Sequence, residues 1–203
     1  MSPTFAERIL ILDRALDEGG IGHGFGGAVA LAYYVQEPRA TRDIDINIAS
    51  PTEEAEAVLA LMPDGIEVSP DAGDVVRRDG QVRLWWDGPT GIPVDLFFPQ
   101  HEFHRQVERD TGPVPFLDRT IPIISATHLA VFKALFNRGR DWPDIEAMLA
   151  AGSVDAEAAL GWVARLVGPD SGPFARLETL VEATAPGEGT GRPPVIDWSA
   201  FGT

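Results

Sequence analysis

Cysteine is absent from this 203-residue chain, and lysine occurs only once, as Lys133. Without cysteine the chain forms no disulfide and offers no thiolate to a metal. No apolar run is long enough to span a membrane, and the first residues include acid and arginine where a secretory signal would be apolar. We therefore expect a cytoplasmic protein without membrane segments.

Basic charge is also scarce. The chain has 16 lysine and arginine residues against 31 aspartate and glutamate residues, a net charge of −15. This balance argues against a protein that coats nucleic acid, because neutralising phosphates needs a basic surface. A nucleic-acid end remains possible as a substrate if arginines gather locally. The candidates are Arg39, Arg42, Arg77, Arg78, Arg83, Arg138 and Arg140.

The length and the apolar content of 44% suit one domain of generous size, or a compact domain with a small helical appendage. Apolar spacing predicts helices at 4–17, 28–36, 125–136, 141–150, 155–167 and 173–183. Strands are predicted at 43–48 and in two runs, VRLWWD and IPVDLFF, that flank the turn GPTG. The pattern indicates an α/β (α+β) portion to about residue 120, then a helical portion and a loosely ordered tail.

Three segments carry local signals. Thr4 and Glu7 have the spacing of a capping box in front of the first helix. Ser50 and Glu53 have the same spacing, so Ser50 is expected to be the N-cap of another helix. Residues 66–79 favour a short strand within a polar loop.

The stretch DIDINI, residues 43–48, alternates acid or amide with isoleucine, which is the period of a strand. Asp43 and Asp45 therefore project from one face, roughly 6–7 Å apart by the rise per residue. Two like charges placed in this way repel unless a cation or a proton lies between them. The pair is therefore expected to hold either a cation or a proton.

A third acid, Asp95, lies in the apolar strand PVDLFF, where a lone carboxylate is costly to bury. On a strand beside Asp43 and Asp45, it would complete an oxygen-only site suited to Mg²⁺ and its triphosphate partners. Two metal ions held by three carboxylates stabilise both the entering and the leaving oxygen of a phosphoryl displacement. The alternative is structural: Asp43 pairs with Arg42 or Arg39, and Asp95 caps a turn.

Gly26 and Gly27 lie where GFGG meets the helix expected from Ala28. Glycine there lets a polyphosphate approach the backbone at a helix N-terminus, although a plain connecting turn needs glycine equally well. Gly22, Gly24 and Gly27 also match G-x-G-x-x-G. A dinucleotide fold is rejected, because a helix and not a strand is expected before these glycines.

The stretch GFGGAVALAYYVQEPRATRDIDI resembles the signature of the nucleotidyltransferase superfamily related to DNA polymerase β: Gly-Gly, a helix, then R-x-T-x-D-I-D. Downstream, HLAVFKALFNRGRDWPDIEAML is similar to the K…R-x-K-D-x-x-D-I stretch of the AbiEii and MenT-like toxin branch. Many members have Gly-Ser where this chain has Gly26-Gly27, and the gap to Asp43 is long. The resemblance spans about residues 20–150.

The resemblance implies a minimal nucleotidyltransferase core at 1–120, with a mixed β-sheet flanked by helices. A helical portion at 121–185 would complete the nucleotide site, and 186–203 would form the tail. Two Mg²⁺ ions are implied at Asp43, Asp45 and Asp95, with Asp95 also acting as the base or orienting it. Nucleotide contacts are implied for Gly26, Gly27, Arg39, Thr41, Lys133 and Asp144.

The implied reaction moves NMP from an NTP to an acceptor hydroxyl and releases pyrophosphate. The acceptor would be a tRNA 3′ end, which would make the protein the toxin of a toxin–antitoxin pair with a cognate antitoxin as partner. One alternative is a small-molecule acceptor such as an aminoglycoside, which the net charge of −15 suits better than RNA. Another is a non-catalytic antitoxin or interaction module of the same fold.

Lys133 falls on the lysine position of the family, where an ammonium near the triphosphate offsets charge on the transferring group. The alternative is a surface lysine on the helix at 125–136. Asp141 and Asp144 match the family as well, but Asp141 is equally well explained as an N-cap and Asp144 as an acid in the first helical turn.

Two aromatic pairs are weaker candidates. His101 and His104 lie three residues apart without an evident third ligand, so we expect a solvated face and not a metal site. Trp85 and Trp86 could stack on a base, but alternating burial in a hairpin explains at least one of them.

Overall fold

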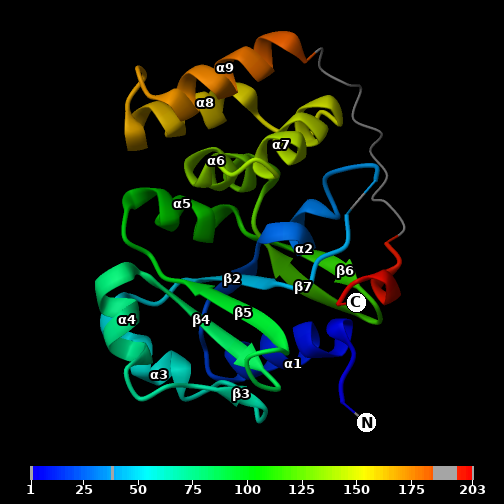
Figure 1. Ribbon diagram of the computed structural model, residues 1–203, viewed down its shortest axis with the longest axis vertical. Helices are drawn as coiled ribbons and strands as arrows, with labels where there is room; N and C mark the ends of the chain where they lie inside the picture. Colours follow the sequence, from blue (N-terminus) through cyan, green and yellow to red (C-terminus); the bar gives the residue numbers. More distant parts are fainter. Residues whose placement is uncertain (1, 38, 185–195, 203) are drawn as a thin grey trace. The chain divides into compact units, whose positions relative to one another are not determined.

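The computed structural model describes residues 2–37, 39–184 and 196–202 (Figure 1). The chain divides into two compact units. The first comprises Met1–Val29, Arg39–Ile124 and Asp197–Thr203, and the second comprises Ala30–Pro38 and Ser125–Ile196. Residues 30–38 thus cluster with the C-terminal helices, and residues 197–203 with the sheet. The division at 1–120, 121–185 and 186–203 stays a prediction.

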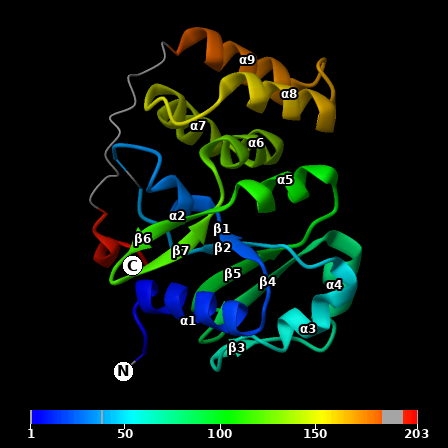
Figure 2. The same ribbon diagram turned by 180° about the vertical axis from the view of Figure 1, so that it is seen from behind.

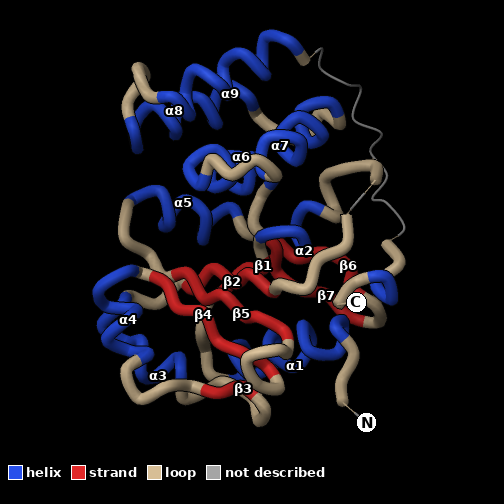
Figure 3. The backbone as a smooth tube through the Cα atoms, viewed as in Figure 1, coloured by secondary structure: helices blue, strands red, loops and turns tan. Residues whose placement is uncertain are grey.

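The first unit is built on a seven-stranded mixed sheet of order β3-β4-β5-β2-β1-β7-β6 (Figure 3). Its central strand β2 pairs in parallel with β5 and antiparallel with β1. The strands are β1 His23–Phe25, β2 Ile44–Ile48, β3 Ile66–Glu67, β4 Gln81–Trp86, β5 Ile92–Phe97, β6 Gly112–Phe116 and β7 Arg119–Ile123. This mixed sheet confirms the predicted fold class.

Helices cover both faces of this sheet. The helices of the unit are α1 Phe5–Glu18, α3 Ala55–Leu59, α4 Ala72–Asp79 and α5 Glu102–Asp110. Helices α1 and α3 lie on one side of the sheet and α5 on the other (Figures 1 and 2). Helix α1 begins with the predicted capping box, in which the Glu7 N–H donates to Thr4 Oγ1 at 3.3 Å. Its apolar face, with Ile9, Leu12 and Leu16, is fully buried.

The second unit is helical. Helix α6, Ala126–Phe136, packs against α7 Asp141–Ala150, α8 Ala156–Val167 and α9 Gly172–Ala183. The guanidinium of Arg176 in α9 lies 4.4 Å from the ring centroid of Trp142 in α7. The hydroxyl of Ser153 donates to the Tyr34 carbonyl at 2.8 Å, which attaches the segment after α2 to these helices.

The predicted hairpin and five of the predicted helices are confirmed, with bounds that agree to within one residue. The helix predicted at 28–36 is wrong beyond Leu31, because α2 spans only Gly27–Leu31. The N–H groups of Tyr33 and Tyr34 then donate to the Ala30 and Leu31 carbonyls, three residues back, which tightens the chain into turns.

The predicted N-cap at Ser50 is wrong. A 3₁₀ turn at Thr52–Glu54 comes first, with extended Pro51 before it and no side-chain cap. The α-helix α3 then begins only at Ala55. Since Pro51 has a ψ of 157°, it lies outside the helix and not at its first position, so Ser50 is too early to cap it.

Helices α4 and α5 and the hairpin of β6 and β7 were not predicted. Helix α4 lies within the segment 66–79, which the sequence assigned to a strand in a loop. Both helices consist mainly of polar residues and bury few side chains, so only a few apolar positions in each sequence indicate a helix. Strand β6 contains Pro113 and Pro115, which is tolerated because β6 lies at an edge of the sheet.

Residues 196–202 are the described part of the predicted tail, and the rest of 186–203 lies outside the described residues. Trp198 and Phe201 are 8% and 6% exposed. Their rings lie 4.6 Å and 6.0 Å, between centroids, from Phe116 and Phe5 respectively. These contacts attach residues 197–202 to the first unit.

Candidate active site

Two of the predicted carboxylates lie side by side on neighbouring strands. In the parallel pairing of β2 with β5, Asp45 is opposite Asp95. Residues opposite one another in a sheet project from the same face, about 5 Å apart across the strands. Isoleucines 44, 46 and 48 face the core, whereas Asp45 is only half-buried. The alternation predicted for DIDINI is therefore confirmed, and it directs Asp45 and Asp95 to the same face.

Asp43 lies just before β2 in the segment that leads into the strand. Its N–H donates to Thr41 Oγ1 at 3.2 Å, a local turn that sets the backbone ahead of Asp45. The Gly202 N–H donates to the Thr41 carbonyl at 2.8 Å, so the C-terminal residues support the same turn. Thr41 thus has a structural role here, and its nucleotide contact stays a prediction. Arg39 is half-buried at the start of this segment.

Gly26 and Gly27 lie directly against Asp45. The Gly26 N–H donates to the Asp45 carbonyl at 2.8 Å. Gly27 has a φ of +53°, a conformation that favours glycine, and a Cβ atom at this position would collide with the Asp45 carboxylate. Gly27 therefore makes room for a carboxylate. The sequence did not predict this role, and the predicted phosphate contact of the two glycines remains untested.

Arg83, on β4, lies on the side of Asp95 opposite to Asp45, so the three side chains form a row across β2, β5 and β4. It lies opposite Asp95 in the antiparallel pairing of β4 with β5. Its Nε and Nη2 atoms donate to the two Asp95 oxygens at 2.7 and 2.6 Å, a bidentate ion pair. This pairing raises the pKa of Arg83, and the nearby charges of Asp43 and Asp45 raise it further. The Arg83 guanidinium thus binds Asp95 and lies near the charges of Asp43 and Asp45.

The Arg83–Asp95 pair was not predicted from the sequence. The alternative that Asp95 caps a turn is wrong, because Asp95 lies within β5 and pairs with Arg83. Counting outward from the turn GPTG, with Trp86 opposite Ile92, would have placed Arg83 opposite Asp95. The signal was therefore present in the hairpin register.

The chemistry of this cluster fits a hard divalent cation. Its donors are carboxylate oxygens from adjacent segments, and they already attract a positive charge. Within residues 2–37, 39–184 and 196–202, no three histidine or acidic side chains are gathered closely enough to hold a metal ion as they stand. Arg83 occupies both oxygens of Asp95. The donor chemistry therefore suits a hard divalent cation, whereas in the observed arrangement Asp95 is paired with Arg83.

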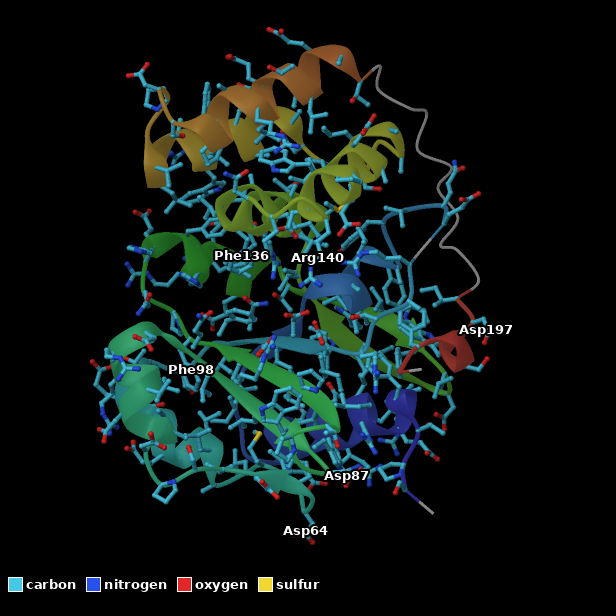
Figure 4. The ribbon with its side chains drawn as sticks, viewed as in Figure 1. Asp64, Asp87, Phe98, Phe136, Arg140 and Asp197 are labelled. Atoms are coloured by element: carbon cyan, nitrogen blue, oxygen red, sulfur yellow. The ribbon has the colours of Figure 1, made fainter. Side chains whose placement is uncertain are left out.

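Lys133, in the second unit, is buried and not a surface lysine. Its side chain in α6 is 4% exposed, and Nζ donates to Asp144 Oδ2 of α7 at 2.6 Å. A second carboxylate, that of Asp141, lies 3.7 Å away and also accepts from Arg138 Nε at 2.8 Å. Asp141 is the first residue of α7, so its predicted N-cap position is wrong by one residue. Arg140, labelled in Figure 4, holds that position, and it is exposed.

The weaker aromatic candidates have ordinary surroundings. Trp86 is 3% exposed in the core and Trp85 is half-buried, as alternation predicts. The guanidinium of Arg83 lies 5.9 Å from the Trp85 ring centroid. His101 is exposed, whereas burial, with His101 beside it, lowers the pKa of the half-buried His104 to about 4.

Comparison with known families identifies the chain. The family model described as nucleotidyl transferase AbiEii toxin, type IV toxin–antitoxin system, matches residues 11–186. The chain belongs to this family. The predicted family and enzyme class are thereby confirmed: the protein is a nucleotidyltransferase. The match also includes α8 and α9, beyond the span of about 20–150 over which the sequence resemblance was recognised.

This AbiEii-family nucleotidyltransferase is similar to solved structures at low sequence identity. An antigenic nucleotidyltransferase-like protein from Paracoccidioides brasiliensis is 16% identical, with a TM-score of 0.50 over 91% of this chain and 97% of that one. The antibiotic-resistance factor ANT(2'')-Ia is 15% identical, with a TM-score of 0.46 over 88% and 89% of the two chains. A search of curated protein sequences found no match.

Membrane-spanning segments were also sought in the AbiEii-family chain. None of the helices in the described ranges is long and apolar enough to cross a membrane.

Proposed function

We propose that this AbiEii-family protein transfers NMP from an Mg²⁺-bound NTP to the 3′-hydroxyl of tRNA, releasing pyrophosphate. The observation that carries the proposal is the pairing of Asp45 with Asp95 on one face of the sheet, with Gly27 shaped around the Asp45 carboxylate. The φ of Gly27 would also suit a plain connecting turn, but such a turn does not by itself require the space that the missing Cβ leaves for the Asp45 carboxylate. Such space is expected where that carboxylate binds a ligand.

The residues of the first unit would share the chemistry. Asp43 and Asp45 would hold two Mg²⁺ ions, and Asp95 would be the third ligand. Bound Mg²⁺ would neutralise the triphosphate and stabilise charge on the entering and leaving oxygens. Gly26 and Gly27 would approach the phosphates through their backbone. Arg39 and Thr41, in the segment that leads into β2, would make further nucleotide contacts.

The transfer step needs a proton acceptor. Asp95, once free of Arg83, would take the proton of the acceptor hydroxyl or orient that hydroxyl. The hydroxyl oxygen then bonds to the α-phosphorus, and the bond from the α-phosphorus to the bridging oxygen breaks. Its electron pair leaves with pyrophosphate. In the second unit, Lys133 is proposed to offset phosphate charge, with Asp144 holding its ammonium in place.

The family description places its members in a type IV toxin–antitoxin system. We therefore infer that the protein acts as the toxin of such a pair in the cytoplasm, with a cognate antitoxin. The net charge of −15 disfavours broad contact with RNA. This charge fits an enzyme that touches only the end of a tRNA, and it also keeps a basic small molecule as the second candidate acceptor.

The acceptor is identified by following label from each α-³²P-labelled NTP. The protein is incubated with Mg²⁺ and either purified tRNA or an aminoglycoside, and the products are separated. We expect label at the 3′ end of tRNA. No label should appear when the tRNA has first been oxidised with periodate, which converts its terminal 2′,3′-diol to a dialdehyde and leaves no acceptor hydroxyl. Label on the aminoglycoside alone would replace the tRNA proposal. The absence of label from every acceptor would favour a non-catalytic member of the fold.

A further inference from the structure

Arg83 binds both oxygens of Asp95, the acid in the middle of the row. The two partners differ in exposure: 51% of the Arg83 side chain is accessible, against 14% of the Asp95 side chain. The carboxylate is thus held in the sheet, whereas the guanidinium reaches it from the solvent side. Of the two, Arg83 is the partner free to leave.

The Arg83–Asp95 ion pair has a well-defined geometry but is expected to contribute little free energy. A bidentate fork fixes the direction of both partners. Because half of the Arg83 side chain is accessible to solvent, the pair is nevertheless screened more than a fully buried ion pair would be. A divalent cation brings two positive charges to the same oxygens and can also draw on Asp45. Exchange of the guanidinium for a divalent cation is therefore energetically accessible.

Exchange leaves the guanidinium without its anion. A guanidinium fork matches a phosphate as well as it matches a carboxylate. A cation that binds without a nucleotide displaces Arg83 but supplies no new anion for its guanidinium. A cation that arrives with a triphosphate supplies a new anion next to the vacated carboxylate.

We propose that Arg83 is the resident counter-ion of the acidic cluster, displaced from Asp95 by the divalent cation and then paired with a phosphate of the nucleotide that accompanies it. The proposal rests on the proposed function, because it takes the cluster as the metal and nucleotide site. It gives Arg83 a positioning role that neither the family match nor the sequence assigned. Arg83 would disfavour free metal and favour the metal–nucleotide complex.

The test is metal binding, measured by calorimetric titration with Mn²⁺, with and without a non-hydrolysable NTP analogue. Arg83→Gln removes the fork, and Arg83→Lys keeps the charge without the bidentate geometry. Arg78→Gln is the matched control, because Arg78 forms the same kind of fork with Asp79 on α4, at 2.9 and 2.7 Å. Each glutamine variant makes the same change in net charge.

We expect Arg83→Gln to bind Mn²⁺ alone about threefold to tenfold more tightly than wild type, as loss of a competing exposed pair predicts. Arg83→Lys should lie in between, and Arg78→Gln should match wild type. The gain in Mn²⁺ affinity on adding the nucleotide analogue should be smaller in Arg83→Gln than in wild type.

Equal or weaker Mn²⁺ binding by Arg83→Gln would overturn the role of Arg83, while Mn²⁺ binding by wild type would leave the proposed function standing. If Arg83→Gln and Arg78→Gln gained Mn²⁺ affinity equally, the effect would come from net charge alone. That result would also overturn the role of Arg83. If wild type binds no Mn²⁺ with or without nucleotide, the metal site fails, and both proposals fail with it.

Discussion

At the scale of single residues, Gly27 connects a backbone conformation to a charged side chain. Its φ of +53° and the closeness of the Asp45 carboxylate are separate reasons for glycine. A second glycine, Gly20, has a similar φ of +71° but would meet nothing within 4 Å if it gained a Cβ. An alanine at Gly20 therefore tests the positive φ alone, whereas an alanine at Gly27 tests the positive φ together with the collision against Asp45.

We predict that Gly27→Ala abolishes nucleotide transfer and stabilisation by Mg²⁺, whereas Gly20→Ala keeps both. Each substitution should lower the free energy of unfolding by about 1 kcal/mol for the left-handed backbone. Only Gly27→Ala should lower it further, because it displaces Asp45. Urea unfolding and the transfer assay measure the two effects. Transfer by Gly27→Ala at the wild-type rate would contradict the assigned role of the glycine.

Lys133 has an ionic environment of a different kind, since both it and Asp144 are buried. Removal of one partner from a buried pair leaves an uncompensated charge. We predict that Lys133→Met lowers the free energy of unfolding by about 3–5 kcal/mol. The exposed Arg140→Met, which removes the same charge, should change it by less than about 0.5 kcal/mol.

The measurement for Lys133 is urea unfolding of Lys133→Met, Asp144→Asn and the double variant. Because the partners are coupled, the double variant should be more stable than the sum of the single effects predicts. Additive effects would show that Lys133 and Asp144 do not stabilise one another. Stability is the readout here because loss of activity alone could arise from unfolding.

At the scale of elements, sequence periodicity located the strands of the site, but it could not show which strands distant in the sequence lie side by side. Alternation identified Asp45, and the cost of burying a lone acid singled out Asp95. Their adjacency depends on the parallel pairing of β2 and β5, which are joined by a connection of more than forty residues, and no local pattern records that pairing. The closeness of Gly27 to Asp45 was missed for the same reason.

The missed elements have physical causes of their own. Helices α4 and α5 are short and consist mainly of polar residues, so each offers only a few apolar positions from which a helix could be predicted. Proline argued against a strand at β6, but an edge strand can tolerate it. The helices of the second unit were predictable because apolar spacing continues over ten or more residues in each.

Helix α5 carries a pH-dependent contribution to stability. Burial, with a further contribution from His101, lowers the pKa of His104 to about 4. An unfolded chain has the ordinary histidine pKa of about 6.5, so it takes up the proton first as the pH falls. The stability linked to His104 is therefore complete above pH 6.5 and is lost as the pH falls towards 4.

We predict that His104→Gln reduces the loss of stability between pH 6.5 and pH 4.5 by on the order of 1–2 kcal/mol, with allowance for the exposed part of the ring. The measurement is urea unfolding of both proteins at the two pH values. His101→Gln serves as a control at an exposed position on the same helix. Parallel losses in wild type and His104→Gln would contradict the assignment.

At the scale of the whole molecule, the net charge of −15 makes cation binding favourable but not specific. A specific site should respond to Mg²⁺ and NTP together. We predict a rise in Tm with both ligands that exceeds the sum of the rises with each alone, because the triphosphate bridges cations held by the acids. Ca²⁺ without nucleotide controls for screening of the acidic surface. A purely additive response would contradict a shared site.

The most direct test of the central claim is single-turnover transfer of NMP to the identified acceptor by wild type, Asp45→Asn and Asp17→Asn. Asp17 is an exposed acid of α1, so its variant controls for the change in charge. We predict that Asp45→Asn loses transfer by a factor of at least about 10³ and that its metal-free fold is as stable as wild type, since a repelling charge is removed. Asp17→Asn should transfer normally. Transfer by a folded Asp45→Asn within a few-fold of wild type would contradict the account.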